Sequence, residues 1–101
     1  MKIFDKASWH IDSGMEETDV INKFKKIFDA LDSLSLLSDE GYEILDFGID
    51  DSISLNENMV NEKGRLFLEE YYDKIIGYDT NNIAEELHKK YYIFCNKQNN
   101  A

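Results

Sequence analysis

The feature of this sequence that most constrains its fold is a long stripe of apolar residues at helical spacing. Between about Glu16 and Leu34, apolar side chains recur every three or four residues: Val20, Ile21, Phe24, Ile27, Phe28, Leu31 and Leu34. This spacing predicts an amphipathic helix with one buried face and one charged, solvated face that includes Lys23. Thr18 is the expected capping residue, and Asp19 and Lys23 are expected to pair four residues apart.

A second pattern recurs after 23 residues and marks two further helix starts. The segment Leu37-Ser38-Asp39-Glu40-Gly41 is matched at this offset by Val60-Asn61-Glu62-Lys63-Gly64. Each copy has an apolar residue, a capping residue, an acid in the first turn and then a glycine, as helix N-termini do. Two copies are too few for a solenoid. We therefore expect both segments to begin helices and both glycines to be points of close packing.

The second of these helices is expected to run from Asn61 to about Ile76, where Gly77 ends it. Its expected inward side chains are Leu66, Phe67, Tyr71 and Ile75, with Glu70 and Lys74 as an exposed pair. A last helix is expected to begin near Asn81 or Asn82. It carries apolar residues inward at Ile83, Ala84, Leu87, Tyr91 and Phe94. These two helices complete the predicted core.

Two segments alternate weakly and leave room for β structure. Residues 7–12, with Trp9 as a core anchor, are compatible with a short N-terminal strand or an extended arm. Residues 47–49 and 53–55 are compatible with a small hairpin. We therefore expect a mainly α fold, a small bundle of about four helices, with a minor β-hairpin or a short N-terminal strand.

Length and composition indicate one domain over residues 1–101. The chain has the size of a single hydrophobic core, no proline, and only five glycines, so nothing resembles a linker. The asparagine-rich end, residues 96–101, offers little to bury and is expected to fray. The sequence does not fix the oligomeric state.

The charge balance and the apolar pattern exclude several classes of function. Eleven basic against 21 acidic residues give a net charge of −10, which disfavours direct nucleic-acid binding and favours a basic partner. No apolar run is long enough to span a membrane, and the N-terminus lacks the apolar segment of a signal peptide. With Cys95 as its single cysteine, the protein is expected in the cytoplasm, away from membranes.

Acidic residues are concentrated in one quarter of the chain. Residues 38–62 contain eight acids and no lysine or arginine, and Tyr42 and Phe47 lie among them. Such a cluster produces a field that attracts a cationic surface, and an exposed aromatic inside a charged rim is typical of a binding hot spot. The candidate partner-binding residues are Asp39, Glu43, Asp46, Asp50, Asp51, Glu57, Tyr42 and Tyr72. A solvated acidic surface that only maintains solubility is the alternative.

Other candidate chemistry is weaker. Residues 46–57 have the length of an EF-hand loop, but Asp51 stands where the turn requires glycine and Gly48 where a ligand is needed. His10 and His88 lie 78 residues apart and match no paired metal motif; we expect a half-buried His10 and a surface His88. Cys95 is expected to be a small buried thiol. The sequence thus predicts neither a metal site nor a cofactor, and no enzymatic activity.

The Glu16 to Leu68 portion resembles, in kind, the immunity proteins of bacterial toxin–immunity systems, both contact-dependent and bacteriocin systems. The resemblance lies in an amphipathic helix and two Ser/Asn-acid-x-Gly helix starts that flank residues 48–55, in a small acidic chain. Tyr71-Tyr72 is similar to the tyrosine pair of colicin nuclease immunity proteins, although the flanking residues differ.

The resemblance implies a protein that neutralises one toxin domain, often a basic nuclease, by stoichiometric binding. The acids would then face lysine and arginine of the toxin, and Tyr42 or Tyr72 would supply buried area. A small helical protein that self-associates through its apolar faces, in a regulatory or structural role, is the competing hypothesis.

Overall fold

The computed structural model describes residues 1–99 and is mainly helical, with a minor two-stranded sheet, as predicted. The elements follow one another as β1 (Ile3–Lys6), α1 (Ala7–Asp12), α2 (Glu17–Ser33), α3 (Asp39–Phe47), β2 (Ser54–Asn56), a 3-10 helix η1 (Glu57–Met59), α4 (Glu62–Ile75) and α5 (Ile83–Asn99). No helix among the described residues has both the length and the apolar character needed to cross a bilayer.

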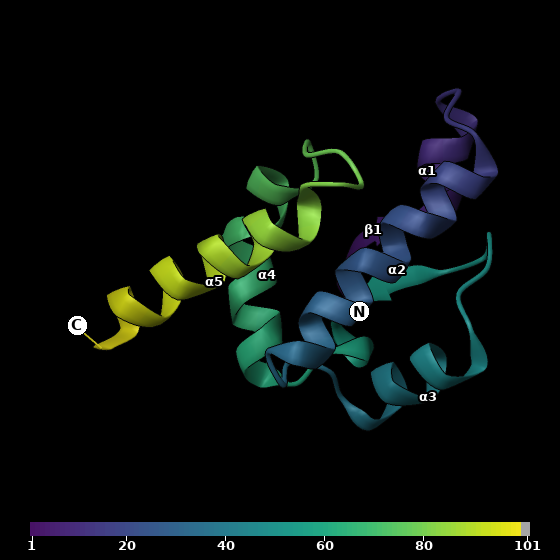
Figure 1. The fold of residues 1–101 in the computed structure, drawn as a ribbon. Helices are drawn as coiled ribbons and strands as arrows, with labels where there is room; N and C mark the ends of the chain where they lie inside the picture. The colour runs from purple at the N-terminus through teal and green to yellow at the C-terminus, as the bar shows by residue number, and fades with distance from the viewer. Residues whose placement is uncertain (100–101) are drawn as a thin grey trace.

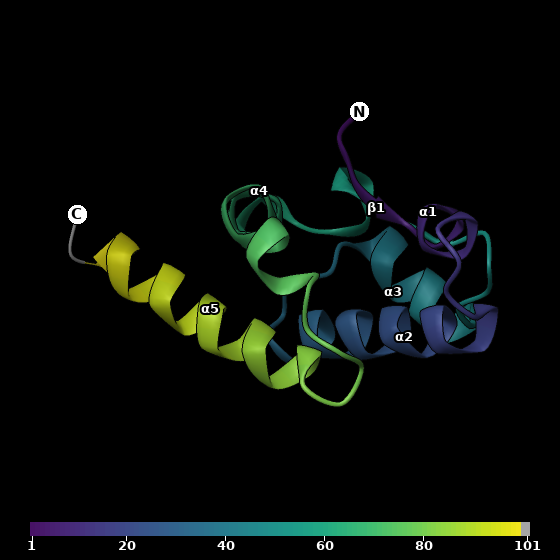
Figure 2. The same ribbon diagram turned by 90° about the horizontal axis from the view of Figure 1, so that it is seen from above.

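Helix α2 is the element on which the rest of the fold packs. It contacts α1, α3 and α5, while α4 contacts α5 and strand β1. Figures 1 and 2 show α1 near one end of α2, and α5 extending away from the body toward the C-terminus on the opposite side. The first part of α5 therefore closes the core, and its last turns project beyond it.

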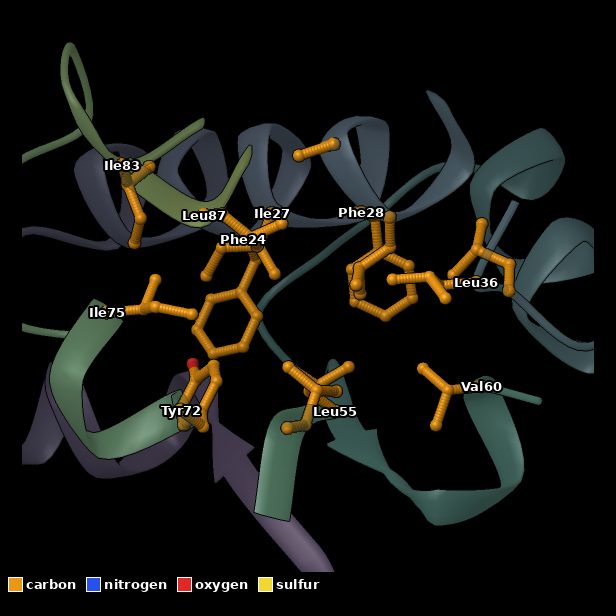
Figure 3. Close-up of a cluster of buried hydrophobic side chains, with 14 of the residues drawn as sticks. Phe24, Ile27, Phe28, Leu36, Leu55, Val60, Tyr72, Ile75, Ile83 and Leu87 are labelled. Atoms are coloured by element: carbon orange, nitrogen blue, oxygen red, sulfur yellow. The ribbon is translucent and has the colours of Figure 1, made fainter. Parts of the chain in front are cut away.

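The predicted apolar stripe of α2 forms the centre of the core. Phe24, Ile27, Phe28 and Leu31 are each at most 1% exposed. Figure 3 shows these side chains facing residues from three other elements: Leu55 of β2, Ile75 and Tyr72 of α4, and Ile83 and Leu87 of α5. Burying such side chains supplies about 1.5–3 kcal/mol each, which makes this cluster the main stabilising feature of the fold.

Two expectations about α2 are wrong. Lys23 lies in the buried part of the helix, 9% exposed, and its Nζ donates to the carbonyl oxygen of Ile76 at 2.7 Å instead of pairing with Asp19. The N-cap residue is Glu16, without a side-chain cap, and not Thr18. The long aliphatic stem of a lysine packs among apolar groups as long as its ammonium finds an acceptor, which hydropathy alone does not reveal.

The two predicted helix starts are confirmed, and they pack against each other. The Ser38 side chain accepts from Gly41 N, and the Asn61 side chain accepts from Gly64 N. An isolated antiparallel bridge joins Leu37 to Val60, with Ser38 N donating to Met59 O and Asn61 N to Leu36 O. Since each partner lies 23 residues from its counterpart, the repeat forms a local pseudo-two-fold pair.

Both repeat glycines are close-packing points, as expected. A Cβ atom on Gly41 would overlap the carbonyl oxygen of Met59, and one on Gly64 would lie 2.7 Å from the carbonyl oxygen of Leu36. Met59 and Leu36 occupy equivalent positions in the two copies. Glycine thus allows each helix to start directly over the backbone of the other copy.

The predicted β structure is in the wrong places. Residues 7–12 form helix α1, and Trp9 is 51% exposed, so it anchors no core. The two segments proposed as a hairpin do not pair; β2 pairs with β1 instead, with Asp5 opposite Leu55 and Lys6 opposite Ser54. This antiparallel pairing joins segments about 50 residues apart, so no local turn signal announces it.

The C-terminal helices follow the prediction with four changes. Leu66 is 43% exposed, and Glu70 pairs with Lys97 of α5 at 2.7 Å instead of Lys74. Gly77 follows the end of α4 without a positive φ. Helix α5 continues to Asn99, so residues 96–99 are helical and not frayed, whereas residues 100–101 lie outside the described part. Packing of α5 on α4 accounts for the changed ion pair.

Candidate functional site

Helix α3 presents an acidic stripe to solvent. Asp39, Glu43 and Asp46 are spaced four and three residues apart, so they lie along one face of the helix, and all three are exposed. The opposite face is held by buried Gly41 and by the half-buried Ile44 and Leu45. The packing of α3 on the body therefore fixes the direction in which its acids point.

Two aromatic side chains stand in the same stripe. Tyr42 is 38% exposed, and Phe47, the last residue of α3, is 92% exposed. Gly48 follows with a φ of 105°, a conformation that ends the helix and turns the chain away. A phenylalanine this exposed gains nothing from burial in the isolated protein, which makes it the most unusual apolar residue of the surface.

The loop after α3 adds two further acids. Asp50 and Asp51 are exposed, while Ile49 and Ile53 on either side are buried and anchor the loop. The Asp50 carboxylate accepts from Ser52 N at 2.9 Å and from Ser52 Oγ at 2.6 Å. These hydrogen bonds lower the pKa of Asp50, so its charge is held in place at neutral pH.

Glu57 is the most separated of the acidic candidates. It lies on η1, which packs against α3, and its side chain is half-buried while its backbone N donates to Lys2 O at 3.0 Å. Among the described residues, no acid from Asp39 to Glu57 forms an ion pair. The negative charge of this surface is thus uncompensated within the molecule.

A hollow of about 330 Å³ separates the C-terminal end of α3 from the loop. Its apolar lining comes from Ile44, Phe47 and Ile53, and its polar lining includes Asp50 and Ser52. We refer to α3, the loop over residues 48–53 and this hollow together as the α3 surface. It offers apolar area for contact inside a ring of negative charge, an arrangement suited to a basic protein surface.

Tyr72 does not belong to this surface, which corrects the sequence prediction. It is 6% exposed, and its hydroxyl donates to Asp5 Oδ2 at 2.6 Å. Tyr71 is buried as well, because α5 covers that side of α4; of the two tyrosine doublets only the second splits, with Tyr91 half-buried and Tyr92 70% exposed. Tyr72 therefore supplies no contact area to a partner.

Asp5 is a buried functional group that the sequence analysis missed. Its carboxylate, 4% exposed, accepts from Tyr72, from His10 Nε2 at 2.8 Å and from Lys6 N at 2.9 Å. Burial, followed by the nearby Asp5 charge, raises the pKa of Tyr72 well above its usual value. No sequence motif connects residues so far apart, so only the fold reveals this cluster.

The remaining candidates are dispersed. His10 is half-buried against Asp5 and His88 is exposed, its Nε2 lying 3.1 Å from Ser33 Oγ, as their expected environments imply. Cys95 is half-buried. Within the described residues, no three His, Cys, Asp or Glu side chains are close enough to hold a metal ion, so the EF-hand-like acids do not converge there.

Comparison with known proteins finds no matching family model, no similar curated protein and no similar solved structure. The function must therefore be argued from the geometry of this chain.

Proposed function

We propose that this protein binds a basic partner protein through the α3 surface. The observation that carries the proposal is Phe47, which is 92% exposed within a segment of unpaired acids. A hydrophobic anchor inside a charged rim is the usual anatomy of a protein-binding hot spot. The resemblance to immunity proteins indicates the class of partner: a toxin domain, neutralised by stoichiometric binding in the cytoplasm.

The two components of the surface have different physical roles. The uncompensated acids attract a cationic surface over several ångströms and speed its association. Phe47 and Tyr42 then lose their exposure in the complex, which slows dissociation. For a nuclease toxin, Asp46, Asp50 and Asp51 would occupy the positions of substrate phosphates and block the path of the nucleic acid.

The charge component is tested with two variants of equal net charge. The partner is captured with the tagged protein at low salt, identified and purified. Binding is then measured by surface plasmon resonance over a range of salt concentrations. Neutralising Asp46, Asp50, Asp51 and Glu57 together is expected to slow association about tenfold or more at low salt and to flatten the salt dependence.

The matched control neutralises Asp12, Glu16, Asp29 and Asp32, four exposed acids of α1, α2 and the turn between them. It makes the same change in net charge at a different place. An equal loss of association rate in both variants would attribute the effect to net charge, and an unchanged rate in the first would reject the α3 surface.

The anchor is tested by Phe47→Ala. Because Phe47 is exposed in the free protein, the substitution should leave stability within about 0.5 kcal/mol and weaken binding by at least about 2 kcal/mol, mainly through faster dissociation. Trp9→Ala is the control, since Trp9 is also an exposed aromatic, 51% exposed, but lies on α1. One-to-one stoichiometry and loss of the partner's toxic activity on mixing complete the test; an active partner in the saturated complex contradicts inhibition.

A specific observation also supports the competing hypothesis of self-association. Tyr92 and Ile93 on the projecting part of α5 are 70% and 46% exposed. Two such helices, side by side, would bury these residues, although a net charge of −10 opposes the contact. Sedimentation equilibrium at high salt, where repulsion is screened, distinguishes the hypotheses: a dimer that Tyr92→Ser dissolves favours self-association, and a monomer rejects it.

A further inference from the structure

A second hollow opens between strand β1 and helix α4, away from the α3 surface. It has a volume of about 390 Å³. Its lining comes from the β1 side, from His10 of α1 and from α4: Lys2, Ile3, Phe4, Asp5, His10, Leu68, Glu69, Tyr72, Asp73 and Ile76. Strand β1 pairs only with β2 in the two-stranded sheet, and its contact with α4 is limited. We call this hollow the β1–α4 cleft.

The floor of the cleft is rigid and negatively charged. Asp5 is held by hydrogen bonds from Tyr72, His10 and the Lys6 backbone. In the described chain every buried side-chain nitrogen and oxygen has a hydrogen-bond partner. The Asp5 carboxylate therefore does not require a ligand, but its charge, under a partly apolar lining, makes the cleft favourable for a cation.

The rim of the cleft carries two more acids with unequal compensation. Glu69 and Asp73 are exposed and lie four residues apart on α4, a spacing at which like charges repel. Arg65 Nη1 pairs with Glu69 Oε1 at 3.1 Å, whereas Asp73 forms no ion pair with any described residue. One carboxylate at the mouth of the cleft is thus available to an incoming cation.

The chain itself already places a cation at this wall. The ammonium of Lys2 lies 5.9 Å from the centre of the Phe4 ring. Lys2 is exposed, so this contact with the ring face is open to competition. The apolar walls of Phe4, Leu68 and Ile76 would in turn receive the aliphatic stem of a cationic side chain.

We propose that the β1–α4 cleft receives an arginine or lysine side chain. The stem lies against Phe4, Leu68 and Ile76, and the charged head reaches Asp73. The volume suits one side chain rather than a globular surface, so this site anchors a single residue of a loop or terminus. That the side chain comes from the partner protein rests on the proposed function, but the preference of the cleft for a cation does not.

The proposal is tested without the partner, using N-acetyl-arginine amide and N-acetyl-lysine amide as probes in an NMR titration of the labelled protein. We expect saturable shifts of backbone amides in β1 and along residues 68–76, with a dissociation constant on the order of 1 mM for so small a ligand. N-acetyl-citrulline amide, a neutral analogue of similar shape, should cause no saturable shift there. Shifts spread over all acidic surfaces, or equal shifts with citrulline, would overturn the proposal.

Two variants with opposite expected effects make the test specific. Asp73→Asn should weaken probe binding about fivefold, because it removes the unpaired carboxylate, while Lys2→Gln should strengthen it about twofold, because it removes a competing cation. Both residues are exposed, so both variants are expected to fold. Asp51→Asn, an equal change of charge on the α3 surface, is the control and should leave probe binding unchanged.

The outcomes separate this proposal from the docking proposal. A cleft that fails to bind either probe, in a protein whose partner binding still depends on the α3 surface, refutes the cleft alone. Selective binding in the cleft, with partner binding insensitive to the α3 acids, supports the cleft and refutes the α3 surface as the docking site.

Discussion

At the residue scale, buried polar side chains decide where α4 lies relative to the rest of the chain. Asp5 and Tyr72 are 67 residues apart in sequence, and Lys23 and Ile76 are 53 apart, yet each pair is joined by a short hydrogen bond. Burial lowers the pKa of Lys23 and raises that of Tyr72, so both groups are less polar in the fold than in solution. Two polar contacts thus pin α4 to β1 and to α2.

The Asp5–Tyr72 contact predicts the behaviour of Tyr72→Phe. The variant loses a hydrogen bond to a buried carboxylate and should be less stable at neutral pH by about 1.5–3 kcal/mol. The pKa of Tyr72 is raised in the fold, so its stabilising contribution is complete below pH 10.0, the ordinary value, and declines as pH rises above it. The stability difference between the two proteins should therefore shrink in alkali.

Urea denaturation of both proteins at neutral pH and at about one unit above pH 10.0 measures this difference. Lys23 titrates in both proteins with a lowered pKa, which gives a stability change of opposite sign, so its effect cancels in the comparison. A stability difference that stays constant over this range would show that Tyr72 ionises equally in the folded and unfolded states.

At the scale of elements, the two helix starts behave as one structural unit. Each capping side chain serves its own helix and also donates across the pair: Ser38 Oγ to Asn58 O, and Asn61 Nδ2 to Ser35 O. The backbone bridge between Leu37 and Val60 lies at the centre of this arrangement. Because α3 begins here, the pair also fixes the orientation of the α3 surface.

Gly41→Ala tests the close approach within this unit. Its Cβ would overlap a backbone oxygen that cannot move without disturbing η1, so we expect a loss of about 2–3 kcal/mol in unfolding free energy. Gly64→Ala should cost somewhat less, since its Cβ would lie 2.7 Å from Leu36 O. Gly77→Ala, with nothing within 4 Å, is the control and should be neutral or slightly stabilising. Equal stability of all three variants in thermal denaturation would refute the packing argument.

Sequence patterns predicted those elements whose signals are local. The stripe of Phe24, Ile27 and Phe28 identified α2, and the caps Ser38 and Asn61 identified the starts of α3 and α4. The β1–β2 pairing was missed because it joins distant segments and depends on the whole fold. Asp5 and Lys23 were missed because hydropathy places a charged residue at the surface unless its partner is known.

The same distinction applies to the functional site. The acids of the α3 surface were predicted from composition, since charge density is readable in a linear sequence. The burial of Tyr72 and the position of Asp73 at the mouth of the β1–α4 cleft were not predicted, because both depend on how α4 packs against β1. Exposure is a property of the tertiary fold, and only Tyr42 and Phe47 met the condition set for an aromatic anchor.

At the scale of the whole molecule, charge is separated between two ends. Residues 38–62 contain eight acids and no lysine or arginine, whereas residues 87–101 contain three lysines and no acid. Figures 1 and 2 show the projecting end of α5 and helix α3 on opposite sides of the body. The lysines therefore do not neutralise the α3 surface, whose field remains available to a partner.

This separation predicts that the α3 surface is destabilising in the free protein. Asp39, Glu43 and Asp46 repel one another along one face, and Asp46 lies in the last turn of α3, where a negative charge opposes the helix dipole. Neutralising Glu43, Asp46 and Asp51 should raise the free energy of unfolding by about 0.5–1 kcal/mol at low ionic strength. Chemical denaturation at low and at high salt measures the gain, which screening should reduce.

The matched variant neutralises three acids at the other end of a helix. Glu16, Glu17 and Asp19 lie at the N-terminus of α2, where negative charge is favourable, so their neutralisation should lower stability by a similar amount despite the same change in net charge. If both variants gained equally, global repulsion alone would explain the effect. Opposite signs would show that the α3 acids are retained against a local cost in stability, as expected for residues whose role is to bind a cationic partner.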